Sequence, residues 1–491
     1  MKKTQLTAVA AGHPDNVQIV LAEKETLDRL TDLLLPSELQ FLHAAAEREV
    51  KTCFFPRAQG AALVRLFAPS TDPAANAEDA RLAGNDLLRE IRQYKIERVT
   101  LHNYCRDNRM FQVAEGMALG NYQFLKYYTR PEKKEHSLRE ICLAGADPEA
   151  VAELDNLLDA VCLTRSLVNE PHSHFTATDL ARAAEISAQQ FGFEAEVLGM
   201  ETLENLKMGG LLAVNQASDV PAQFIVLHYC PETARETAPI VLIGKGVVYD
   251  TGGLSLKPSD GMDYMKCDMA GAATVIGAIA VAAKNKLPVR LIGLIPATDN
   301  KIGERAMSPG DVIRMYSGDT VEVVNTDAEG RLILADALHY AKQYQPALVL
   351  DFATLTGAAV RALGSQAICY MGTAPQNVKS ALEKSGWNTY ERLVELPLWK
   401  EYGEELKSNI ADLRNLGAGN AGMITAGKFL QHFAGDMPWL HLDIAGPAYL
   451  RHANGYRTKE GTGVGVRLLY DFLKNYSASI TSPSAEALDD Q

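Results

Sequence analysis

The chain has 491 residues, of which 47% are hydrophobic and 22% charged, so it can build two or three globular domains. Its 48 Lys and Arg against 61 Asp and Glu give a net charge of −13, which argues against nucleic acid or anionic lipid as a partner. Seven scattered cysteines favour reduced thiols over a disulfide framework. Because no apolar run reaches the ~18 residues of a membrane span, we expect a cytoplasmic protein without a membrane partner.

The first part of the chain predicts a small domain of its own. Helical patterns at 38–50 and 75–95 alternate with short apolar segments, as in an α/β domain. Apolar residues then recur at helical spacing over 151–166. We therefore expect an amino-terminal α/β domain over 1–150, joined by that linker helix to a catalytic domain over 167–476.

From about residue 165 the sequence pattern changes, and short apolar runs alternate with helix-like segments. The expected strands are 222–227, 239–243, 288–295, 320–324, 347–350 and 439–442, and the clearest helices are 270–284 and 330–343. This pattern predicts an α/β fold with a mixed, largely parallel central sheet flanked by helices. Functional groups in such folds gather at the carboxyl ends of the strands. The small, polar residues 477–491 predict a mobile tail.

The first candidate site follows the strand at 239–243, in the segment GKGVVYDTGGLSLKPSDGMDYMKCDMAGAA at 244–273. Its glycines do not have P-loop or dinucleotide-binding spacing, because Pro239 and Tyr249 stand where glycine is needed. The candidate residues of this segment are then Lys245, Asp250, Lys257 and Asp268. Solvated loop charges are one interpretation. A ligand site is the other, favoured by the glycines on both sides of Lys245.

The second candidate site is NTDAEGRL at 325–332, between an expected strand and an expected helix. Asp327 and Glu329 can converge on one point there, and their repulsion is costly unless a cation or a shared proton relieves it. Arg331 could relieve part of it, so a structural ion pair is an alternative to a metal site.

Together the candidates Asp250, Asp268, Asp327 and Glu329 offer four carboxylates, a donor set that suits Mn, Mg or Zn. With bridging carboxylates it suits two ions about 3.5 to 4 Å apart, as in two-metal hydrolases. Lys245 could join them only as a neutral amine. HExxH and paired-cysteine zinc motifs do not occur in the sequence.

NTDAEGRL resembles the signature of the leucyl (cytosol) aminopeptidase family of two-metal metallopeptidases. The segment 244–273 resembles the family's metal-binding stretch, and further segments of the chain resemble others in the family. These are DFATLTGA at 351–358, SNIADLRN at 408–415, AGMITAGKFL at 421–430 and HLDIAGPA at 441–448. The resemblance covers about 165–470, while 1–150 matches only in size and position. Ser173 and Ala177 depart from the family pattern, away from the metal-binding stretch.

The resemblance implies a role for each residue of the site. Two Mn or Zn ions would be held by Lys245, Asp250, Asp268, Asp327 and Glu329. Lys257 and Arg331 would be catalytic: Lys257 would stabilise the tetrahedral intermediate formed by a metal-bridging water, and Arg331 would hold a bicarbonate general base. The pocket for the first side chain would be lined by Met265, Asn325, Thr354, Gly357, Ala445 and Ala448.

The resemblance therefore implies a metal-dependent aminopeptidase that removes the amino-terminal residue from short peptides with a free amino terminus. It also implies a homohexamer. A two-metal phosphoesterase is one alternative, although more histidine ligands or a richer basic lining would then be expected. A DNA-binding or architectural role is another, against which the charge of −13 weighs.

Overall fold

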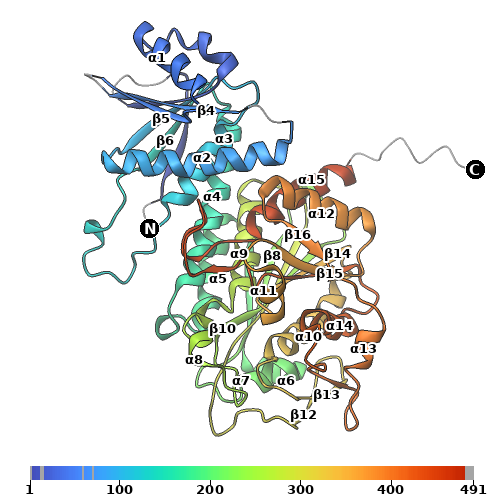
Figure 1. The fold of residues 1–491 in the computed structure, drawn as a ribbon. Coiled ribbons are helices and arrows are strands. Elements are labelled where there is room, and N and C mark those ends of the chain that lie inside the picture. The colour runs from blue at the N-terminus through green and yellow to red at the C-terminus, as the bar shows by residue number, and fades with distance from the viewer. Residues whose placement is uncertain (1–2, 12–15, 58–59, 69–70, 482–491) are drawn as a thin grey trace, which may run out of the picture. The chain divides into compact units, whose positions relative to one another are not determined.

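The computed structural model describes residues 3–11, 16–57, 60–68 and 71–481, with side chains described as far as residue 476 (Figure 1). The chain divides into two compact units. The first comprises Met1–Cys162 and His452–Lys459, and the second Leu163–Arg451 and Glu460–Gln491. The division falls inside α4 (Pro148–Asn169), the helix that covers the expected linker. Among the described residues, no helix has the length and apolar character needed to cross a membrane.

The first unit contains a six-stranded sheet in the order β1-β6-β5-β2-β4-β3, parallel except for the β3–β4 pair. Its strands are β1 (Gln5–Val9), β2 (Val17–Glu23), β3 (Thr52–Pro56), β4 (Ala61–Phe67), β5 (Arg98–Asn103) and β6 (Glu140–Ala144). Its helices, with η for short 3₁₀ turns, are η1 (Lys24–Leu30), α1 (Pro36–Glu47), α2 (Pro73–Gln93), α3 (Met110–Asn121) and η2 (Pro131–Lys133). The unit is therefore α/β, as predicted.

The second unit is built on a nine-stranded mixed sheet with the path β16-β15-β18-β14-β9-β11-β8-β7, in which β10 pairs with β11. The central strands β18, β14, β9, β11 and β10 run parallel to their neighbours in this group, whereas β15, β8 and β7 pair antiparallel. The strands are β7 (Glu194–Leu198), β8 (Gln223–Tyr229), β9 (Ile240–Gly244), β10 (Gly246–Asp250), β11 (Leu291–Asn300), β14 (Leu348–Ala353), β15 (Ile368–Gly372), β16 (Leu393–Glu395) and β18 (Trp439–Asp443). A mixed sheet with a parallel centre confirms the predicted fold class.

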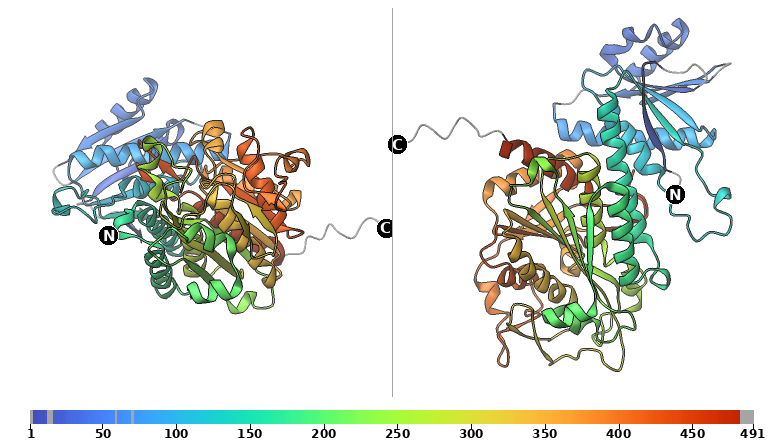
Figure 2. Two further views of the ribbon diagram at one scale, coloured as in Figure 1. Left: turned by 90° about the horizontal axis from the view of Figure 1, so that it is seen from below. Right: turned by 180° about the vertical axis from the view of Figure 1, so that it is seen from behind.

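Helices cover both faces of this sheet (Figures 1 and 2). On one face α9 (Ala270–Lys284) packs on β9, β11 and β14, beside α5 (Ala177–Phe191) and α15 (Val466–Thr481). On the other, α10 (Glu329–Ala341) packs on β9 and β11, beside α7 (Gly209–Asn215) and α14 (Gly422–Ala434). Strands buried on both sides explain the continuous apolar runs of the sequence, since β9 has no exposed position.

The remaining elements lie mainly in connections. They are η3 (His172–His174), α6 (Met200–Leu206), η4 (Glu232–Ala234), α8 (Ser259–Met262), η5 (Met265–Cys267), β12 (Val312–Arg314), β13 (Thr320–Glu322), η6 (Lys342–Tyr344), α11 (Gly357–Leu363), α12 (Gln376–Thr389), α13 (Glu401–Glu404), β17 (Leu413–Arg414), β19 (Tyr449–Leu450) and β20 (Glu460–Gly461). The strands β12, β13 and β17 form a small separate sheet, so the strand expected at 320–324 is not part of the central one.

The small residues at the start of α9 bring that helix close to the sheet. A Cβ atom on Gly271 would lie 2.0 Å from the carbonyl oxygen of Phe352 in β14, so only glycine permits this approach. The small residues of the AGAA run at 270–273 thus allow the close approach. It also fixes the position of Asp268, which precedes the helix.

Two boundaries differ from those expected. α10 begins at Glu329 instead of beyond it, so Glu329 lies in the first helical turn, where the helix dipole favours a carboxylate. α15 continues to Thr481, so helix covers 477–481, the beginning of the expected tail; residues 482–491 lie outside the described residues. A helix that has formed over the apolar pattern before 477 extends easily into the residues that follow, because adding a residue to an existing helix costs little.

Candidate metal centre and active site

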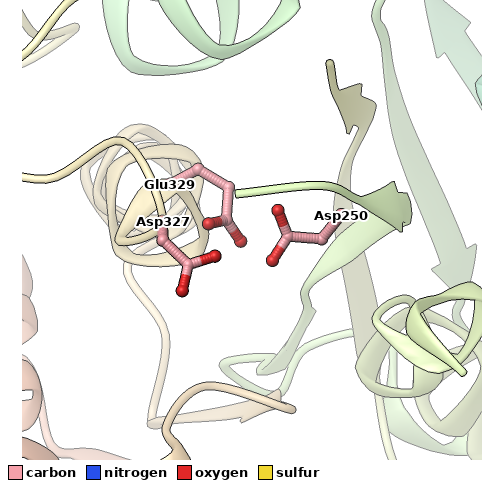
Figure 3. Close-up of side chains that lie close together, drawn as sticks. All are labelled: Asp250, Asp327 and Glu329. Atoms are coloured by element: carbon pink, nitrogen blue, oxygen red, sulfur yellow. The ribbon is translucent and has the colours of Figure 1, made fainter. Parts of the chain in front are cut away.

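The two candidate segments of the sequence meet at the carboxyl ends of the parallel strands. Asp250 ends β10, while Asp327 and Glu329 stand at the start of α10. Figure 3 shows the three carboxyl groups pointing toward one another. One carboxylate oxygen from each residue lies within 4.8 Å of one oxygen of each of the others. This is the spacing of oxygen atoms that ligate a common cation.

Two lysines tie the other carboxylates into the same cluster. Lys245, which follows β9, places its Nζ 2.7 Å from Asp268 Oδ2 and 2.8 Å from Glu329 Oε1. Lys257 places its Nζ 2.7 Å from Asp250 Oδ2 and 2.5 Å from Asp327 Oδ1. The five residues proposed as metal ligands and the proposed catalytic lysine, Lys257, thus lie in one contiguous network.

The local sequence after Asp250 explains how Lys257 returns to the cluster. Gly252 and Gly253 have φ angles of 85° and 63°, in the left-handed region that glycine tolerates best. The turn closes with a hydrogen bond from the Lys257 N–H to the carbonyl oxygen of Thr251. A Cβ on Gly252 would also lie 2.9 Å from Asp327 Oδ1. The TGGLSLK segment therefore forms a tight loop directly against the carboxylates.

Burial and mutual repulsion make the carboxylates of this cluster hard to ionise together. Burial raises the pKa of Asp250 to about 6, and the charge of Glu329 adds to the shift although the lysines oppose it. Burial likewise raises the pKa of Asp268 well above its usual value. For Glu329 the order reverses: burial would raise its pKa, but Lys245 and Lys257 together hold it below the usual value.

The lysines respond in the opposite sense. Burial would lower the pKa of Lys245, but Asp268 and Glu329 outweigh it and hold the pKa above the usual value. Burial also opposes the charge of Lys257, whose pKa is nevertheless raised by Asp250 and Glu329. Each ammonium is therefore held by the negative charge around it.

The donor set fits divalent cations. Four carboxylates face two lysines, so the cluster carries more negative than positive charge in a buried place, which is costly without further cations. Two buried oxygens, Asp268 Oδ2 and Asp327 Oδ1, accept no well-aligned hydrogen bond from any described residue, although a lysine nitrogen lies within ion-pair distance of each. Each of these oxygens therefore has a lysine ammonium as its neighbour, and carboxylate oxygens gathered in such an acidic cluster are typical of metal ligands.

Arg331 lies in the first two turns of α10 and is buried. One terminal nitrogen donates to the carbonyl oxygen of Asn415 at 2.7 Å. Its Nε has no hydrogen-bond partner among the described residues. Burial lowers the pKa of Arg331 to about 10, so the guanidinium stays charged at neutral pH. A buried cation with an unused donor can hold an anion.

The six residues expected to line the substrate pocket come from four connections. Thr354 follows β14 and donates from Oγ1 to Asp268 Oδ1 at 2.8 Å, and its carbonyl oxygen accepts from Lys245 at 3.1 Å. Asn325 accepts the Asp327 N–H at 2.7 Å through Oδ1. Met265 begins η5 and Gly357 begins α11, while Ala445 and the buried Ala448 follow β18. Thr354 and Asn325 thus bond directly to the carboxylate cluster or its backbone.

Sequence analysis missed Asn300 and Asn415. Asn300 ends β11, and its amide donates to Asp250 Oδ1 at 2.8 Å and to the Thr326 carbonyl oxygen at 3.1 Å. Asn415 donates to the Asn325 carbonyl oxygen at 2.7 Å and accepts from Arg331. The polar run Thr298–Asn300, which follows the apolar part of β11, is the signal that could have found Asn300. Asn415 lies in SNIADLRN, a segment noticed only for its resemblance.

Comparisons with known proteins agree with this geometry. The model of the cytosol aminopeptidase family, catalytic domain, matches residues 162–470. The probable cytosol aminopeptidase of Geobacter sp. (strain M21) is 46% identical over 368 residues, 74% of each chain. That of Chloroherpeton thalassium is 38% identical over 462 residues, 88% of this chain and 90% of the relative.

Solved structures extend the likeness to nearly the whole chain. The cytosol aminopeptidase from Coxiella burnetii has a TM-score of 0.82 at 30% identity and covers 95% of this chain and 99% of its own. The bottromycin maturation enzyme BotP in complex with Mn has a TM-score of 0.82 at 31% identity, over 95% of this chain and all of that one. The chain therefore belongs to the cytosol aminopeptidase family and is a hydrolase that acts on peptide bonds.

Proposed function

We propose that the chain is a two-metal aminopeptidase that removes the amino-terminal residue from short peptides. The single observation that carries the proposal is the cluster of four carboxylates, of which Asp250, Asp268 and Glu329 are buried, with oxygens of Asp250, Asp327 and Glu329 within 4.8 Å of one another. Membership of the cytosol aminopeptidase family indicates that the substrate is a peptide bond. The structure of BotP in complex with Mn supports a divalent ion as the ligand of the cluster.

The metal-holding residues would be Lys245, Asp250, Asp268, Asp327 and Glu329. Asp250 and Glu329 would be shared between two Mn or Zn ions, as the family resemblance implies; Glu329 contacts Lys245, Asp250 contacts Lys257, and an oxygen of one lies within 4.8 Å of an oxygen of the other. When bound, such a pair lowers the pKa of water and polarises a carbonyl group. Asn300 would orient Asp250, since its amide donates to Oδ1 while Oδ2 faces the Lys257 ammonium.

Lys257 would stabilise the negative charge that develops on the peptide carbonyl oxygen. Its side chain reaches Asp250 and Asp327 from the loop and stays partly accessible, with 16% of the side chain exposed. An ammonium already held in place by two carboxylates needs little reorganisation during the reaction, which is the condition for effective electrostatic catalysis.

Arg331 would hold a bicarbonate ion near the reacting bond, and that ion would act as the general base. The support is local: the guanidinium is buried and charged, and its Nε is free of partners among the described residues. The guanidinium donates to the Asn415 carbonyl oxygen, and this bond fixes its orientation. The other N–H groups of the guanidinium are therefore held in a fixed direction.

The first side chain of the peptide would enter a pocket formed by Met265, Asn325, Thr354, Gly357, Ala445 and Ala448. Apolar and small residues in this set favour an uncharged side chain. A homohexamer stays a prediction from the sequence. A cytoplasmic location stays one as well, and the names of the cytosol aminopeptidase relatives support it.

A panel of free-amine and amino-acetylated peptides, each assayed with and without Mn, tests the proposal. We expect chelation to abolish hydrolysis, Mn to restore it, and acetylation to block it. Cleavage of the acetylated peptides would remove the exopeptidase assignment. Cleavage of a phosphate ester, with the peptides untouched, would favour the phosphoesterase alternative. Activity that survives exhaustive chelation would contradict a metal-dependent site.

A further inference from the structure

Asp443 is a buried carboxylate outside the proposed metal and catalytic residues. It ends β18, and only 1% of the residue is exposed. Its Oδ1 accepts the N–H groups of Leu355 and Ala445, both at 3.1 Å. Its Oδ2 accepts the Thr356 hydroxyl at 2.7 Å. A buried carboxylate that accepts three hydrogen bonds holds three points of the chain at fixed distances.

Those three points belong to two connections that also contain residues of the proposed substrate pocket. Leu355 and Thr356 stand between Thr354 and Gly357, while Ala445 is a pocket residue itself. Thr356 is also the N-cap of α11, because its Oγ1 accepts the Ala359 N–H at 3.1 Å. The connection after β14 and the connection after β18 are thus joined through one carboxylate.

The charge of Asp443 also acts on Arg331. Burial would lower the pKa of Arg331, and Glu329 and Asp443 are the two largest influences that oppose the shift. His441, two residues before Asp443, is bonded to Asp351 and faces the same buried region. Asp443 therefore bonds to the pocket backbone, and its charge also acts on the guanidinium proposed to be catalytic.

We propose that Asp443 is a positioning residue that sets the spacing of the pocket for the first side chain of the peptide. The inference rests on the proposed function, because it takes its pocket residues from there. Asp443 touches no substrate atom: it acts through the backbone of Leu355 and Ala445 and through the hydroxyl of Thr356. Its loss should change substrate preference more than the intrinsic rate.

Asp443→Asn tests this inference with little change in shape. The amide oxygen can still accept from Leu355 and Ala445, but an NH₂ group replaces the oxygen that accepts from Thr356. We expect kcat/KM for leucyl 4-nitroanilide to fall by about tenfold, mostly through KM, because one buried hydrogen bond is worth about that factor. For alanyl 4-nitroanilide, whose side chain fills less of the pocket, we expect less than a threefold fall.

Thr356→Val removes the same hydrogen bond from the other side. It also removes the cap on the Ala359 N–H, so it should be the stronger single variant, and it should lower the leucyl-to-alanyl ratio in the same direction. The double variant should lose no more than Thr356→Val alone, since the Thr356–Asp443 hydrogen bond is broken in both single variants. Equal losses for both substrates, or additive losses in the double variant, would overturn the inference.

Asp336→Asn is the matched control. Asp336 is also fully buried, in α10, and accepts the backbone N–H groups of Leu211 and Tyr316, which are not pocket residues. Its replacement should change thermal stability and leave the leucyl-to-alanyl ratio as in the unaltered chain. A ratio shifted equally by both variants would overturn the inference. Failure of the unaltered chain to cleave either amide would instead refute the proposed function.

Discussion

Gly330→Ala probes how firmly Lys245 is held in the metal centre. Gly330 is the second residue of α10, and a Cβ there would lie 2.5 Å from Lys245 Cε and 2.7 Å from Nζ. Carbon atoms in contact normally stay about 3.5 to 4.0 Å apart, so the lysine would have to move by about 1 Å. The ammonium cannot move freely, because it contacts Asp268, Glu329 and the Thr354 carbonyl oxygen.

The size of the effect follows from two opposed contributions. Alanine in place of glycine stabilises a helix by at most about 1 kcal/mol. Displacing a buried ammonium from its carboxylates costs about 3 to 5 kcal/mol. We therefore expect Gly330→Ala to lower the free energy of unfolding by about 2 to 4 kcal/mol, against the helix-propensity trend. Because the displaced lysine belongs to the proposed metal site, Mn-dependent activity should fall as well.

Urea denaturation in the presence of chelator measures the stability change, and hydrolysis of an aminoacyl amide at several Mn concentrations measures the change at the site. Gly422→Ala is the control, because a Cβ on this helical glycine would meet Ala358 Cβ at an ordinary 3.5 Å. The control should be neutral or slightly stabilising. A Gly330→Ala variant as stable as the control, with unchanged Mn dependence, would show that Lys245 is not confined as the structure indicates.

Three further perturbations separate the roles within the cluster. Asp327→Ala should lose activity by several orders of magnitude yet remain folded by circular dichroism, because the change removes a repelling charge; full activity would exclude the residue from the mechanism. Lys257→Ala should retain bound metal, measured by elemental analysis, and turn over slowly; loss of the metal would reassign the lysine. Burial raises the pKa of Asp336 to about 7, so its contribution to stability should decline as pH rises from about 4 to 7, and urea midpoints of Asp336→Asn should lack that decline.

Much of the site could be predicted because its chemistry is local in sequence. Asp250 and Asp268 lie within one loop and helix connection, and Asp327 and Glu329 are two residues apart, so the acidic clusters are visible before any folding. What joined them was the rule that parallel strands present their carboxyl ends at one edge. The strands at β9 and β14 were recognisable because they are apolar throughout most of their length.

Other features depend on tertiary contacts and leave little trace in the sequence. Asn300 follows the polar residues Thr298 and Asp299, which hide the last part of β11 from a hydrophobic pattern although the whole strand is buried. The segment His452–Lys459 belongs to the first unit although the residues on both sides of it belong to the second. The hydrophobic periodicity of the sequence does not predict this. The role of Asp443 in joining two loops depends on hydrogen bonds to groups 87 and 88 residues away. Such bonds depend on the tertiary fold and cannot be predicted from the local sequence.

Strand direction decides which strands supply the site. Asp250, Asn300 and Asp443 are each the last residue of a parallel strand, β10, β11 and β18, while Lys245 and Thr354 directly follow β9 and β14. The antiparallel strands β8 and β15 present their amino ends at this edge and contribute no proposed site residue. A reversal of any central strand would exchange a functional carboxyl end for an amino end. The parallel core is therefore what allows residues almost 200 positions apart to share one buried centre.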